Sequence, residues 1–127
     1  MKKISFDFDS VLDNKHIQEF VKELVKDFDV HIVTSRPEIP KFKDTWNNDD
    51  LYEVSDNLGI DRDNIHFTEY DDKFKFFLNH PDFTFHLDDD LIEIEFINDY
   101  SDVIGILFDD GWKENCLKYL KYEKRVS

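Results

Sequence analysis

Ile4-Ser5-Phe6-Asp7-Phe8-Asp9-Ser10-Val11-Leu12 is the stretch of sequence that decides the fold. Its apolar residues predict a buried strand that ends in two carboxylates. Side chains two positions apart share a strand face, so we expect Asp7 and Asp9 to point the same way. Ligands bind in open α/β sheets at the carboxyl ends of the strands, so the pair is expected to bind a cation, a proton or both. The alternative is a polar turn that caps the next helix.

Length and composition indicate one ordered domain. The 127 residues predict a single domain over residues 1–127, because a chain of this size builds one core. Hydrophobic residues make up 40% of the chain, and thirteen phenylalanines supply much of the area to be buried.

Acidic side chains dominate the charge of the chain. Its 30 Asp and Glu residues against 16 Lys and Arg residues give a formal net charge of −14. Such a surface repels phosphate backbones, which argues against long nucleic acid as a partner. A short polynucleotide end stays a candidate for a metal-lined pocket, and 113–125 is the one stretch that offers a basic groove.

Cysteine usage and hydropathy bear on the cellular setting. The single cysteine, Cys116, excludes an intramolecular disulfide, and we expect it to be a small buried residue on a C-terminal helix. No signal peptide or membrane span is predicted, so we expect no membrane partner. Together these absences predict a reducing, cytoplasmic location.

Short β-rich runs alternate with amphipathic stretches, which predicts repeated βα units. After the first strand, we expect strands at 30–34, 65–68, 83–87 and 103–108, helices at 16–27, 50–58, 73–78, 91–97 and 111–122, and irregular chain at 37–44. Residues 91–97 also alternate as a strand would, but the next strand follows too soon. The sequence therefore predicts an α/β fold, a single Rossmann-like domain with a mostly parallel five-stranded sheet flanked by helices.

Polar side chains fall at four successive βα junctions. In chain order these are Asp7 and Asp9, Thr34, Lys73, and Asp88 with Asp89. In this order, and in the motifs at 6–12, 32–36 and 86–90, the chain resembles the haloacid dehalogenase (HAD) superfamily of phosphohydrolases. The four motifs of that superfamily are Asp-x-Asp, a Thr or Ser, a Lys and an acidic pair. The resemblance covers nearly the whole chain, with Ser10 at a position where Gly is more usual.

The resemblance implies a phosphatase, a hydrolase of phosphate monoesters that works through an aspartyl-phosphate. Asp7 would be the nucleophile. Asp9 would protonate the leaving alkoxide and then deprotonate the attacking water. This role requires a proton on Asp9 at the start, which a nearby carboxylate and partial burial favour. Lys73 would hold the nucleophile and the transferred group in register.

The resemblance also implies a magnesium cofactor. A phosphate monoester repels a carboxylate nucleophile unless a cation and a lysine neutralise its charge. The implied Mg²⁺ ligands are one oxygen of Asp7, the backbone carbonyl of Asp9, and the carboxylates of Asp88 and Asp89.

A small phosphorylated substrate, of nucleotide type, is implied by the similarity to short nucleotidase-like members. Thr34, Ser35 and Arg36 would bind it, with the Thr34 hydroxyl on a phosphoryl oxygen. The connections between the motifs leave room for no cap domain or a minimal one, so the expected site is open.

Each candidate residue also has a structural interpretation. Thr34 is the kind of residue that makes a turn, and Lys75 competes with Lys73 for the third motif. Residues 88–90 would by default cap a helix, and Arg36 would form a surface ion pair. The histidines of the predicted strands lack the spacing of metal ligands, so we expect core or strand-face positions for His31, His66 and His86.

Two other classes of protein use similar residues. A response-regulator receiver domain also needs acids, a Thr and a Lys, but in an order that this chain does not follow. A catalytically inactive HAD-like binding or regulatory module stays open as the alternative to a phosphatase.

Overall fold

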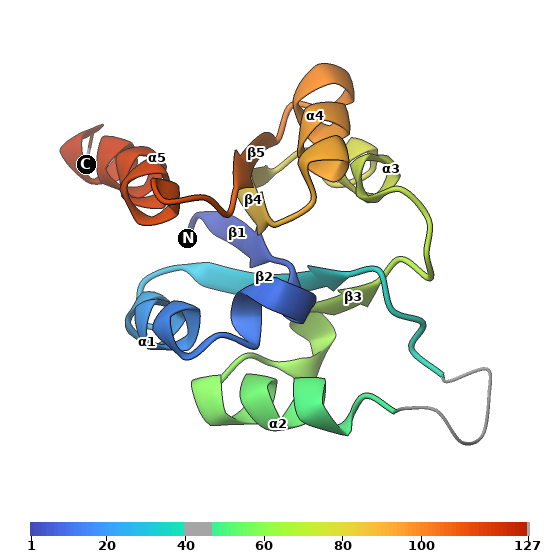
Figure 1. Ribbon diagram of the computed structural model, residues 1–127. Coiled ribbons are helices and arrows are strands. Elements are labelled where there is room, and N and C mark those ends of the chain that lie inside the picture. The colour runs from blue at the N-terminus through green and yellow to red at the C-terminus, as the bar shows by residue number, and fades with distance from the viewer. Residues whose placement is uncertain (40–46, 127) are drawn as a thin grey trace.

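Five parallel strands form the centre of the molecule (Figure 1). A computed structural model describes residues 1–39 and 47–126, with the backbone alone for 122–126. The strands are β1 (Lys3–Phe6), β2 (Asp29–Thr34), β3 (Ile65–Phe67), β4 (Phe83–Asp88) and β5 (Ile104–Leu107). Their order is β3-β2-β1-β4-β5, and every neighbouring pair is parallel. The predicted α/β fold with a five-stranded parallel sheet is confirmed.

The strand order reverses at β1. The chain runs outward from β1 through β2 to β3 and then returns to β4 on the other side of β1. Ligands of open α/β sheets bind outside the carboxyl ends of the strands at such a reversal. The first strand, with Asp7 directly after it, therefore ends at the place where this topology favours a site.

Helices cover both faces of the sheet (Figure 1). One face packs against α1 (Lys15–Leu24), α2 (Asp49–Leu58) and α5 (Trp112–Val126), and the other against α3 (Lys73–Leu78) and α4 (Leu91–Tyr100). Short turns, η1 (Phe8–Leu12) and η2 (Arg62–Asn64), complete the described elements. The ambiguous stretch 91–97 is helical, as predicted. Of the stretch expected to be irregular, 37–39 has no helix or strand and 40–44 lies outside the described residues.

Strand alternation divides the interior into two cores. The larger core contains Ile4, Phe6 and Ile32, together with apolar residues of α1, α2 and α5. Cys116 is buried there, as predicted. The smaller core lies under α3 and α4 around Phe77. The alternate strand positions on that side carry polar residues, namely Ser5, His31 and His86.

Helix ends follow local sequence rules. Asp90 caps α4, since its side chain accepts hydrogen bonds from Ile92 N at 3.0 Å and Glu93 N at 3.3 Å. Gly59 ends α2 with φ of +79°, a left-handed conformation that glycine adopts without strain. Gly105 allows a close approach of α4, because a Cβ there would lie 3.1 Å from Ile94 O.

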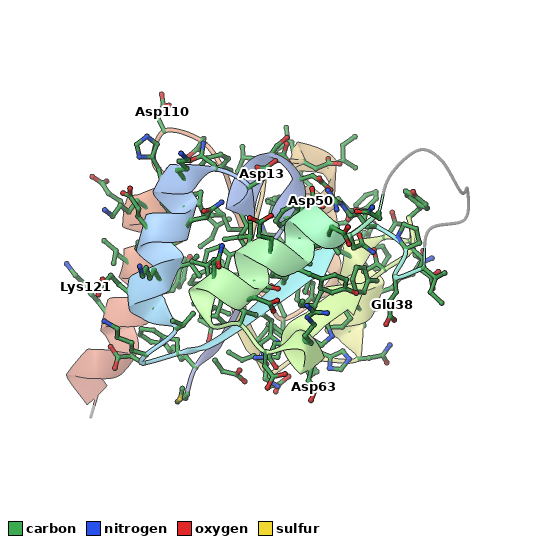
Figure 2. The ribbon with its side chains drawn as sticks, turned by 90° about the horizontal axis from the view of Figure 1, so that it is seen from below. Asp13, Glu38, Asp50, Asp63, Asp110 and Lys121 are labelled. Carbon is green, nitrogen blue, oxygen red and sulfur yellow. The ribbon has the colours of Figure 1, made fainter. Side chains whose placement is uncertain are left out.

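The acidic surface is spread over many segments. Figure 2 shows side chains projecting outward from separate segments, among them Asp13, Glu38, Asp63 and Asp110, all of which are exposed. Across residues 1–39 and 47–126, no helix combines the length and the apolar character needed to cross a membrane.

Candidate functional site

The turn after β1 separates the two carboxylates of the first motif. The strand ends at Phe6, and η1 begins at Phe8 with hydrogen bonds such as Leu12 N to Asp7 O at 3.2 Å. The expectation that Asp7 and Asp9 share a strand face is therefore wrong, because the backbone has entered a turn before Asp9. Asp7 lies against Lys73, whereas Asp9 lies against Arg36.

Asp7, Lys73 and Asp88 form a buried triad at the carboxyl edge of the sheet. Lys73 Nζ lies 2.9 Å from Asp7 Oδ1 and 2.6 Å from Asp88 Oδ2. The exposed fractions of these side chains are 2% for Lys73, 9% for Asp7 and 0% for Asp88. The lysine is the first residue of α3, and its backbone N–H donates to Glu93 Oε2 at 3.1 Å, which ties α3 to α4. Three separate junctions of the chain thus meet through one ammonium group.

The choice between Lys73 and Lys75 is decided by the phase of α3. Lys75 lies two residues further along the helix, where its side chain is 55% exposed. Its ammonium pairs with Asp71 Oδ1 at 3.0 Å. Of the two candidate lysines, Lys73 is the one that lies beside Asp7.

Burial and charge act on the triad in opposite directions. Burial and the neighbouring Asp88 carboxylate outweigh the Lys73 charge and raise the pKa of Asp7 to about 8. Burial alone would also raise the pKa of Asp88, but the His86 hydrogen bond and the Lys73 charge hold it below its usual range. The pKa of Lys73 is raised, since its two carboxylates outweigh burial. One ammonium faces two carboxyl groups, so the triad has an excess of negative charge only when Asp7 is ionised.

A third carboxylate gives this edge the character of a cation site. Among the residues that the structure describes, Asp7, Asp88 and Asp89 form a group whose ligand oxygens all lie within 4.8 Å of one another. Burial and the Asp88 charge raise the pKa of Asp89, although its side chain is exposed. A set of carboxylate oxygens fits Mg²⁺ or another hard cation. The Asp9 carboxylate is not part of this group, and its backbone carbonyl as a ligand stays a prediction.

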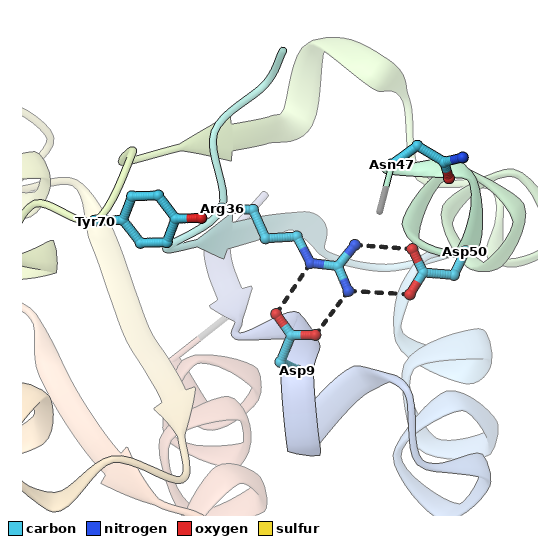
Figure 3. A pocket seen from close by; sticks show the side chains of 5 residues that line it. All are labelled: Asp9, Arg36, Asn47, Asp50 and Tyr70. Atoms are coloured by element: carbon cyan, nitrogen blue, oxygen red, sulfur yellow. Dashed lines mark hydrogen bonds and ion pairs between the residues drawn. The ribbon is translucent and has the colours of Figure 1, made fainter. Parts of the chain in front are cut away.

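Asp9 belongs instead to an exposed network with Arg36 and Asp50 (Figure 3). The Arg36 guanidinium donates to both Asp9 oxygens, at 2.7 and 3.1 Å, and to both Asp50 oxygens, at 2.8 and 3.0 Å. It also lies over the Phe8 ring, 5.0 Å from the centroid. The two carboxylate side chains are 55% and 59% exposed. Hydrogen bonds to Asp50, and to Asp9, raise the pKa of Arg36, which stays charged.

A pocket of about 530 Å³ opens at this network (Figure 3). Its lining residues are Asp9, Arg36, Asn47, Asp50 and Tyr70. Tyr70 is 66% exposed. Glu69 and Tyr70 have φ of 54° and 66°, a left-handed conformation that is uncommon for residues with a side chain. Backbone bonds from Tyr70 N to Ser35 O at 2.7 Å and from Glu69 N to Arg36 O at 3.3 Å hold this segment against the end of β2.

Thr34 is the last residue of β2, and Ser35 follows it directly before Arg36. Thr34 is fully buried, and its Oγ1 accepts a hydrogen bond from Arg36 N at 3.3 Å. This is the turn that the structural interpretation of Thr34 predicts. Contact of Thr34, Ser35 or Arg36 with a phosphoryl group stays a prediction.

Sequence reasoning missed four residues that support the site. Ser5 is hydrogen-bonded to His86, which is hydrogen-bonded to Asp88. Glu93 accepts a hydrogen bond from the first backbone N–H of α3, and Asp50 forms an ion pair with Arg36. The spacing of His86 from Asp88 was a usable sign, because residues two apart on a strand share a face. Asp50 comes from α2 and carries no local sequence sign.

Fold and site together define a class: a parallel α/β protein with a buried lysine–carboxylate triad where the strand order reverses. No protein-family model matches this chain, and no curated protein matches it. The chemistry of the site is therefore the ground for a functional proposal.

Proposed function

We propose that this protein is a magnesium-dependent phosphatase that hydrolyses phosphomonoesters through an aspartyl-phosphate on Asp7. The observation that carries the proposal is the buried Lys73 ammonium between Asp7 and Asp88, at 2.9 and 2.6 Å. A carboxylate that attacks phosphorus needs a fixed positive charge beside it, and burial makes that charge effective. The order of the four motifs shared with the HAD superfamily supports the same reaction.

In the proposed reaction, an oxygen of Asp7 attacks phosphorus as the bond to the leaving oxygen breaks. Lys73 Nζ and Phe8 N both donate to Asp7 Oδ1, which orients the carboxylate. Magnesium, when bound by Asp7, Asp88 and Asp89, supplies positive charge that offsets the repulsion between carboxylates and phosphoryl oxygens. Asp9 then transfers a proton to the leaving oxygen and later takes one from the water that hydrolyses the aspartyl-phosphate.

The pocket beside Asp9 is the proposed position of the leaving group. One of its lining residues, Asp9, is two positions after the nucleophile in sequence, and another, Tyr70, is exposed. We extend the proposal to a small, nucleotide-type substrate because of the resemblance to short nucleotidase-like members, and because a flat group can stack on an aromatic ring. A cytoplasmic location belongs to the same proposal, since the one cysteine is a buried free thiol.

The ion pair between Arg36 and Asp9 favours a second candidate function. Both oxygens of the Asp9 carboxylate accept hydrogen bonds from Arg36, so Asp9 must leave Arg36 before it can carry a proton to the leaving group. If it never does, the protein is a HAD-like binding or regulatory module that holds a phosphorylated ligand without turnover.

The test is hydrolysis of p-nitrophenyl phosphate with Mg²⁺, with EDTA, and with Asp7→Asn as the matched variant of equal size. We expect turnover in the wild type with Mg²⁺, loss of turnover with EDTA, and none from Asp7→Asn. The variant should still unfold cooperatively, because burial already disfavours the charge of Asp7. Binding of phosphate esters without turnover would favour the module, and turnover by Asp7→Asn would contradict Asp7 as the nucleophile.

A further inference from the structure

Ser5 and His86 form a buried polar pair behind Asp88 that the proposed reaction does not use. They are register partners on β1 and β4, and both are 0% exposed. Ser5 Oγ lies 2.8 Å from His86 Nδ1, and His86 Nε2 lies 2.8 Å from Asp88 Oδ2. The Phe77 ring covers the imidazole at a centroid distance of 5.2 Å. Polar groups in such a position are costly unless fully hydrogen-bonded, so their presence calls for an explanation.

The acceptors around His86 decide where its proton lies. A carboxylate can only accept, so Nε2 must be the nitrogen that donates to Asp88. The Ser5 hydroxyl lies 2.8 Å from the other ring nitrogen, Nδ1, and 3.5 Å from Phe85 O, so Nδ1 is its nearer partner and can accept its proton. Ser5 thereby selects the tautomer that presents a donor to Asp88.

These contacts leave Oδ1 as the less occupied oxygen of Asp88. Its Oδ2 accepts from both Lys73 Nζ and His86 Nε2, which occupies both lone pairs of that oxygen. Its Oδ1 accepts from Asp90 N at 3.1 Å and retains one lone pair. The imidazole of His86 thus supplies the second donor to Oδ2.

We propose that Ser5 and His86 are a positioning pair that turns Asp88 so that it binds a divalent cation through Oδ1 alone. The inference rests on the proposed function in assuming a cation at Asp7, Asp88 and Asp89. Without the pair, Asp88 can rotate about its side-chain bonds and the Lys73 ammonium can follow it. Partners that orient a metal ligand in this way are worth about 10- to 100-fold in metal affinity.

The experiment is calorimetric titration of Mg²⁺ into the wild type and four variants, with cooperative thermal unfolding checked for each. His86→Leu, which lacks a donor, is expected to bind Mg²⁺ about 10- to 100-fold more weakly, and Ser5→Ala about 10-fold more weakly. His86→Gln keeps an N–H donor and should recover most of the affinity. Phe77→Leu changes packing on the same ring but removes no polar group, so its affinity should equal that of the wild type.

Three results would overturn the positioning role: wild-type affinity in His86→Leu, no recovery in His86→Gln, or an equal loss in Phe77→Leu. If His86→Leu does not fold, Ser5→Ala at wild-type affinity overturns it. The two proposals fail separately, because a wild type that binds Mg²⁺ but hydrolyses no phosphomonoester contradicts only the phosphatase. A wild type that binds no Mg²⁺ contradicts both.

Discussion

Asp7 and Asp9 are two residues apart in sequence but lie in opposite environments. The Asp7 side chain is 9% exposed beside a buried lysine, whereas the Asp9 side chain is 55% exposed beside an arginine. Buried charges are screened little by salt, and exposed ones strongly. A charge on Asp7 is therefore little screened by salt, whereas a charge on Asp9 is exposed to solvent and salt. The buried lysine suits the role of Asp7 as a nucleophile. The exposed position of Asp9 beside Arg36 differs from the partly buried position beside a carboxylate that was expected from the sequence for a proton donor.

The largest effect is expected from removing the lysine of the buried triad. Lys73→Ala should lower kcat by about two to four orders of magnitude, the scale for losing a charge that stabilises the transition state. It should also lower the free energy of unfolding by about 3–5 kcal/mol, because two buried carboxylates lose their cation. Activity assays and urea denaturation measure the two effects.

Lys75→Ala is the matched control on the same helix. Its ammonium is exposed and pairs with the surface residue Asp71 at 3.0 Å, so both kcat and stability should stay nearly unchanged. A loss of activity in Lys75→Ala with wild-type activity in Lys73→Ala would move the third motif to Lys75.

Asp9→Asn tests the exposed side of the comparison. We expect kcat for alkyl phosphates to fall by about 10²- to 10⁴-fold, the range for losing a general acid–base group. The first step with p-nitrophenyl phosphate should suffer less, because nitrophenolate leaves without a proton. The aspartyl-phosphate at Asp7 should then accumulate and appear as a mass increase after rapid quenching. Stability should change little, since the lost ion pair is exposed.

Two outcomes would contradict this role of Asp9. If Asp9→Asn hydrolyses alkyl and aryl phosphates as fast as the wild type, Asp9 transfers no proton. If it is as destabilised as Lys73→Ala, the contrast between a buried and an exposed side is wrong.

The sequence predicts the buried side better than the exposed side, for a physical reason. Parallel strands end at one edge, so the order of the strand ends was enough to bring Asp7, Lys73, Asp88 and Asp89 together. Choosing Lys73 over Lys75 needed the phase of α3. The partner of Asp9 depends on a turn and on Asp50 of α2, which is 41 residues away in sequence. Neither periodicity nor motif spacing predicts contacts of that kind.

The burial of a histidine, His66, predicts how stability depends on pH. Burial, with the neighbouring His31 and His80, lowers the pKa of His66 to about 4, below the ordinary histidine value of 6.5. Between these values His66 binds the proton more readily in the unfolded chain, so its contribution to stability is full above pH 6.5 and falls as the pH drops toward 4. The partly exposed ring limits this contribution to on the order of 1 kcal/mol, or about 3–5 °C in Tm.

Thermal unfolding at pH 7.5 and pH 5.0 measures this dependence. His66→Phe should show a smaller fall in Tm than the wild type, because the group that takes up the proton is gone. The exposed His16 is the control, and His16→Gln should fall as far as the wild type. An equal fall in all three proteins would show that other groups carry the pH dependence.

The smallest effect is expected at Ser10, in the turn that separates the two carboxylates. Ser10 has φ of 63°, a backbone conformation that is strained for a residue with a Cβ. Its side chain is exposed, so no burial compensates for this strain. Ser10→Gly should raise the free energy of unfolding by about 0.5–1 kcal/mol, since the relief of left-handed strain exceeds the backbone entropy cost of glycine. Ser10→Ala keeps the Cβ and should bring no gain in urea denaturation. If the two variants are equally stable, Ser10 stores no backbone strain in this turn. The separation of Asp7 and Asp9 then depends on the hydrogen bonds of η1 and on the ion pair between Arg36 and Asp9.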